Sequence, residues 1–147
     1  MKATGMSFQW LDMRITEEKQ RREREATAQE RLPRAFDELY GQLRACVESY
    51  QAAFGAESAE IRRHEADVQV TVRAERAGQW QQCAQVCVQA VPALPGFRVE
   101  NGGEPLQIHL GTLPGDRLLF KHEEQYLTVE QLTRLILDPA LFQNLGE

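Results

Sequence analysis

Cysteines are the side chains of this chain that most directly suggest metal binding. Cys83 and Cys87 lie four residues apart, but structural zinc sites use two cysteine or histidine pairs, and no second pair follows here. On a helical projection of this segment both cysteines fall on its apolar side, where cysteine behaves as a small apolar residue. We therefore expect both to pack in the core, and we expect no metal and no cofactor.

The other reactive groups lack the neighbours that catalysis needs. Cys46 has no histidine nearby in the sequence, whereas a catalytic cysteine needs a base and a group that lowers its pKa. His109 and His122 are expected on opposite faces of a hairpin. Glu123 and Glu124 are adjacent, so in a regular strand they would point to opposite faces and could not share a substrate. The sequence also contains neither a phosphate-binding glycine loop nor a Gly-x-Ser-x-Gly elbow.

Composition and charge restrict the class of protein and its partners. The 147 residues carry a net charge of −5, whereas nucleic-acid-binding domains usually gather positive charge on one face. No apolar stretch approaches the roughly 20 residues of a membrane span, and no signal peptide is recognisable. The three cysteines cannot all pair within one chain. We expect a soluble cytoplasmic protein that binds neither nucleic acid nor membranes.

A long helix over residues 16–54 is the first element that the pattern predicts, and its two parts differ. Residues 16–31 contain five acidic and five basic residues and almost nothing apolar. From residue 32 onward apolar side chains recur every three or four residues, which predicts a buried stripe that ends at Gly55. Pro33 lies between the parts and either begins a new helix or kinks a continuous one.

The charged part of this helix is the strongest hint of function in the sequence. A helix that is polar all round is not held by its own core, so residues 16–31 are expected to be exposed or to meet a partner. Ion pairs between neighbouring turns would neutralise most of its charges. The partner surface is expected to include Glu18, Arg21, Arg22 and Glu25. Residues 1–15 form an arm that we expect to dock on its own domain or on a second copy through Phe8, Trp10, Leu11 and Met13.

The middle of the chain has the period-two pattern of strands. Apolar and polar residues alternate from Val68 to Val72, which is typical of a strand with one buried face. Residues 79–91 are compatible with a helix or a strand, and we favour the strand. Short turns between neighbouring strands predict antiparallel pairing. Further strands are expected at residues 61–65, 97–100, 106–110 and 117–121 and around Tyr126.

The loop that begins at Pro114 predicts how two of these strands pair. Loop length decides which residues of a hairpin share a face. With a three-residue loop at 114–116, Leu110 faces Phe120 on an apolar face, and His109 lies beside Lys121 on the other face. A loop one residue longer or shorter would mix the two faces.

The end of the chain predicts a closing helix. Thr128 and Gln131 have the spacing of a capping box, and Pro139 is expected to end the helix near Asp138. Together the elements predict an α+β fold, in which the long N-terminal helix and the C-terminal helix pack on an antiparallel sheet of about four to six strands. Residues 32–147 form one domain, preceded by the helical extension and the arm.

Three functions follow from this fold, and they belong to different classes. An exposed helix rich in both charges, without a catalytic motif, favours a non-enzymatic interaction or accessory protein that binds a protein partner or forms a homodimer. The alternative is a module for a small apolar ligand, with a cavity between sheet and helix that is lined by Phe36, Tyr40 and Phe54. The third is an enzyme whose residues come from separate strands and leave no local motif.

Overall fold

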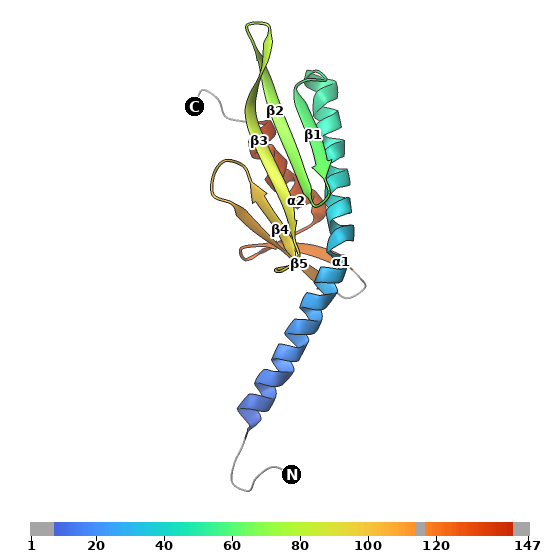
Figure 1. Cartoon of the computed structure of the whole chain (residues 1–147), viewed down its shortest axis with the longest axis vertical. Helices are drawn as coiled ribbons and strands as arrows, with labels where there is room; N and C mark the ends of the chain where they lie inside the picture. Colours follow the sequence, from blue (N-terminus) through green and yellow to red (C-terminus); the bar gives the residue numbers. More distant parts are fainter. Residues whose placement is uncertain (1–7, 114–116, 143–147) are drawn as a thin grey trace.

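One helix dominates the architecture of the chain. The computed structural model describes residues 8–113 and 117–142, and α1 (Gln9–Phe54) spans 46 of them without interruption. At 1.5 Å per residue this helix is roughly 70 Å long. Pro33 lies inside α1, so the helix kinks there rather than starting anew, and Figure 1 shows a change of direction where α1 leaves the body of the protein.

The start of α1 differs from the prediction. The helix begins at Gln9 rather than near Thr16, so the second half of the predicted arm is already helical. Phe8 is the residue before the first turn, and its side chain makes no capping hydrogen bond. No strong capping residue sets this boundary, and the helix propensities of the preceding residues do not mark it either.

Within the described residues, seven strands form a single antiparallel sheet in which every strand pairs with its neighbours in the sequence. This count exceeds the predicted four to six, and the ambiguous segment at 79–91 is indeed a strand. The strands are β1 (Ala59–His64), β2 (Asp67–Arg76), β3 (Gln79–Val91), β4 (Gly96–Glu100), β5 (Leu106–Leu113), β6 (Arg117–His122) and β7 (Gln125–Leu127).

The predicted register of the β5–β6 hairpin is confirmed. Leu110 pairs with Phe120 and His109 pairs with Lys121. Leu110 and Phe120 are buried, whereas His109 is exposed on the opposite face. The loop residues 114–116, on which the prediction depended, lie outside the described residues.

The second helix, α2 (Val129–Leu141), begins as predicted and ends later. The hydroxyl of Thr128 accepts a hydrogen bond from the backbone of Gln131, whose side chain accepts one from the backbone of Thr128, which completes the capping box. Pro139 does not end the helix. The amide of Phe142 donates to the carbonyl of Asp138, so the helical ladder continues past the one hydrogen bond that the proline cannot make.

The hydrophobic core lies between the sheet and the two helices, which cover the same face of it (Figure 1). Phe36 of α1 packs against Phe97 of β4 with ring centroids 5.8 Å apart, and Phe97 packs against Phe120 of β6 at 5.7 Å. These three rings join helix and sheet across the middle of the core. Along α1 the buried residues begin at Ala28, so the preceding five turns contribute nothing to this core.

Candidate interaction surface

The N-terminal half of α1 projects away from the sheet, as Figure 1 shows. Its first turns carry large apolar side chains that are between 38% and 67% exposed, which we call the apolar end. Their expected docking on the domain itself is therefore wrong, and docking on a second copy stays a prediction. The apolar end consists of Phe8, Trp10, Leu11, Met13 and Ile15.

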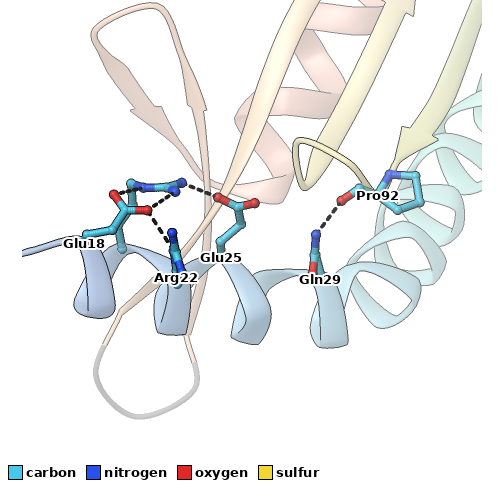
Figure 2. Close-up of polar contacts among 6 residues, drawn as sticks. Glu18, Arg22, Glu25, Gln29 and Pro92 are labelled. Carbon is cyan, nitrogen blue, oxygen red and sulfur yellow. Dashed lines mark hydrogen bonds and ion pairs between the residues drawn. The ribbon is translucent and has the colours of Figure 1, made fainter. Parts of the chain in front are cut away.

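The four charged residues predicted as a partner surface are brought together by α1 and paired with one another (Figure 2). Arg21 donates from Nε and Nη2 to both carboxylate oxygens of Glu18, at 3.0 and 2.6 Å, and from Nη1 to Glu25 at 2.6 Å. Arg22 Nε donates to the same carboxylate of Glu18 at 2.9 Å. Their contact with a partner stays a prediction.

This ion-pair cluster changes the acidity of its members. The hydrogen bonds from Arg21 and then Arg22 lower the pKa of Glu18 to about 2, and Glu18 in turn raises the pKa of Arg21. The side chains are exposed, where ion pairs contribute little to stability and are screened by salt. The cluster spans two turns of a segment without a core of its own, so its effect is to favour helix there.

A cleft of about 470 Å³ lies where α1 leaves the domain. Its helical wall carries Arg21, Arg24, Glu25 and Ala28. Its other walls come from the loop before β4 and from strands β5 to β7. The apolar side chains among them are Leu94, Pro95, Leu110, Leu119 and Tyr126. The cleft thus combines a mostly apolar interior with a charged rim.

The loop between β3 and β4 is held close to α1 on one side of this cleft. Gln29 Nε2 donates to the backbone carbonyl of Pro92 at 3.1 Å (Figure 2). Gly96 pairs so closely with β5 that a Cβ atom there would lie 1.9 Å from the carbonyl oxygen of Ile108. Glycine at this position therefore lets the loop reach β5 and form the wall.

The three aromatic residues predicted to line a ligand cavity lie apart. Phe36 is buried in the core, and Tyr40 is half-buried with the guanidinium of Arg63 over its ring at 5.2 Å. Phe54 is 58% exposed and packs on Tyr50 with ring centroids 4.8 Å apart. Phe54 lies roughly 27 Å along the helix from Phe36, so a small ligand could not contact all three.

A second hollow, which the sequence did not indicate, lies between α1 and α2. This groove has a volume of about 760 Å³ and is bordered by Cys46, Tyr50 and Phe54 of α1. Leu137 of α2 and Phe142 after it form the opposite side. The apolar stripes of the two helices predicted a buried face on each helix. The groove depends on how the helices pack against each other, which neither stripe determines.

The two cysteines expected in the core are not there. Residues 79–91 form a strand, so Val86 and Val88 face the core and Cys87 lies on the other face, half-buried. Cys83 is exposed, and its thiol lies 3.4 Å from the carbonyl oxygen of Val72. Partial burial, followed by the charge of Glu100, raises the pKa of the Cys87 thiol, which disfavours the reactive thiolate.

Residues 8–113 and 117–142 contain neither a cluster of metal ligands nor a membrane-spanning helix. Within these ranges no three side chains of the types His, Cys, Asp or Glu gather as ligands for a metal ion. Neither of the two helices there combines the length and apolar character needed to cross a membrane. Comparison with protein-family models, curated proteins and solved structures gave no significant match.

Proposed function

We propose that this chain is a non-enzymatic protein–protein interaction module that presents the N-terminal half of α1 to a protein partner. The observation that carries this proposal is the apolar end, five neighbouring apolar side chains exposed on a helix that projects from its domain. Large apolar side chains that stay exposed close together at one end of an element often mark an interaction site.

The chemistry of the apolar end suits a protein interface. Aromatic residues and methionine are enriched in interfaces, and tryptophan in particular often contributes much of the binding energy. Fully burying one such side chain stabilises a complex by roughly 1.5–3 kcal/mol. Leu11 lies roughly 25 Å along the helix from Ala28, the first buried residue of α1, so a partner can reach the end without contacting the sheet.

The proposal is tested by capture with the full chain as bait. The double variant Trp10→Ala, Leu11→Ala removes two side chains of the apolar end. Phe54→Ala is the matched control, because Phe54 is a similarly exposed apolar residue near the other end of the same helix. We expect the wild type and the control to recover the same protein, or a second copy of the chain, and the double variant to recover at least tenfold less. Equal recovery by all three baits, or association with no protein at all, would overturn the proposal.

A further inference from the structure

We infer that the partner of the apolar end is a second copy of this chain, bound antiparallel so that Phe8 and Leu11 of each copy occupy the cleft of the other. This inference deepens the function proposed above and rests on it. Both halves of the contact are present on every chain, since the apolar end lies at residues 8–15 and the helical wall of the cleft lies at residues 21–28. In a dimer with two-fold symmetry, the contact between the apolar end and the cleft would form twice.

The seam of contact is a row of residues spaced three and four apart. Such spacing places them along one side of a helix, where a second helix can run alongside. With the two-fold axis between residues 19 and 20, each member of the row lies level with another member on the partner. The row consists of Leu11, Arg14, Glu18, Arg21, Glu25 and Ala28.

Charge complementarity favours this register over registers shifted by one residue. Glu18 lies opposite the partner's Arg21 and Arg14 opposite the partner's Glu25, and the two-fold axis doubles both pairs. Between residues 11 and 28 no charged residue then faces one of the same sign. Shifting the register by one residue would place Arg14 opposite the partner's Arg24 in one direction, and Glu17 opposite the partner's Glu23 in the other. Like charges set against each other disfavour these alternatives.

The existing ion pairs leave room for these contacts. The side chain of Arg21 is 54% exposed and that of Glu18 is 42% exposed, so carboxylate and guanidinium groups of a partner can reach them. A guanidinium has five donors, of which Arg21 uses three within its own helix. The same residues can therefore stiffen one helix and bind the other.

The apolar ends complete the contact. In this register Leu11 reaches the partner's Ala28, which is buried and lines the cleft. Phe8 lies one turn further, beside the loop that Gln29 holds against the helix through Pro92. Leu94 on that loop is 61% exposed and becomes covered. The cleft volume of about 470 Å³ is within the range of pockets that enclose small molecules, so it can accept these two side chains.

A mixing experiment separates contacts between chains from contacts within one helix. The full chain is expected to sediment as a dimer, whereas Glu18→Arg alone and Arg21→Glu alone each place like charges opposite one another twice. Each variant alone should therefore have at least a tenfold higher dissociation constant. An equimolar mixture of the two should restore the dimer, because each chain then supplies the charge that the other lacks. Mixing changes nothing within either helix, so restoration reports pairing between chains.

A control variant and a disulfide cross-link test this register directly. Arg44→Glu, a charge reversal in the exposed part of α1 outside the seam, should leave the dimer intact. With the three native cysteines replaced by serine, Arg14→Cys combined with Glu25→Cys should give a disulfide-linked dimer on oxidation, and neither substitution alone should.

Two other outcomes would overturn this inference without overturning the proposed function. A dimer that is weakened by Trp10→Ala, Leu11→Ala but is not restored by mixing would reject this arrangement and support the proposed function. A chain that stays monomeric at the highest concentration reached would reject a second copy as the partner. The capture experiment would then decide whether the apolar end binds another protein.

Discussion

The two halves of α1 are made by one continuous helix yet are stabilised by different forces. From Ala28 to Val47 a stripe of side chains is buried in the core, and Leu39 and Leu43 are fully inaccessible. Before Ala28 the helix has no buried residue and is supported by ion pairs between neighbouring turns. Continuity of secondary structure therefore says nothing about which part belongs to the folded core.

The largest difference in stability effect between the two halves of α1 should come from truncating a core side chain. Leu39→Ala leaves a cavity in a packed site and should lower the free energy of unfolding by about 2–5 kcal/mol. Leu11→Ala removes the same atoms from an exposed position and should change it by less than about 0.5 kcal/mol. Urea unfolding at a concentration where the chain is monomeric measures both. Similar losses for the two variants would show that the N-terminal half is packed in solution.

A substitution at Pro33, between the two halves, should have the next largest effect on the free energy of unfolding, with the opposite sign. Pro33 is exposed within the helix, where proline removes one backbone hydrogen bond and crowds the preceding turn. Pro33→Ala should therefore raise the free energy of unfolding by roughly 1–3 kcal/mol. Pro139→Ala, at the other interior proline, is the matched control. Destabilisation by Pro33→Ala alone would mean that the bend is needed for the contact between Gln29 and Pro92.

The smallest effect should come from protonating the charged cluster. The pKa of Glu18 is lowered from 4.5 to about 2, so the stabilisation by its ion pairs is complete above about pH 4.5 and is lost as the pH falls to about 2. We expect the helical content of the N-terminal half to fall over this interval while the core half keeps its structure. NMR titration of the Glu18 carboxyl measures the pKa directly. Glu18→Gln should remove this pH dependence, and a titration near 4.5 would contradict the ion pairs.

Local patterns in the sequence predicted the elements whose determinants are local. The capping box at Thr128, the alternation in β2 and the register of Leu110 with Phe120 each follow from a few neighbouring residues. The cysteines were misplaced because residues 79–91 fit two periods. The helical period puts Cys87 on the same side as Val88, whereas in β3 the two residues lie on opposite faces. The length of α1 before Thr16 was missed because no capping residue marks its start.

The candidate surface was only partly visible in the sequence. Ion pairs between charged residues four apart were predicted, and Arg22 with Glu18 and Arg21 with Glu25 form such pairs. The pair of Glu18 with Arg21, three apart, was not predicted. The cleft could not be predicted, because it forms where the loop that carries Leu94 meets the helix. That meeting depends on the close approach of Gly96 to Ile108 and on the bond from Gln29, which join segments far apart in the sequence.

The order of the strands has a consequence for how the chain folds. Because every strand pairs with its sequence neighbour, the sheet can grow by adding one hairpin after another, and each addition closes only a short loop. The step that joins distant residues is the docking of α1 onto the sheet, as in the contact of Phe36 with Phe97. The projecting half of α1 takes part in neither step. Its sequence is thus free to change with its partner while the folding route of the domain stays the same.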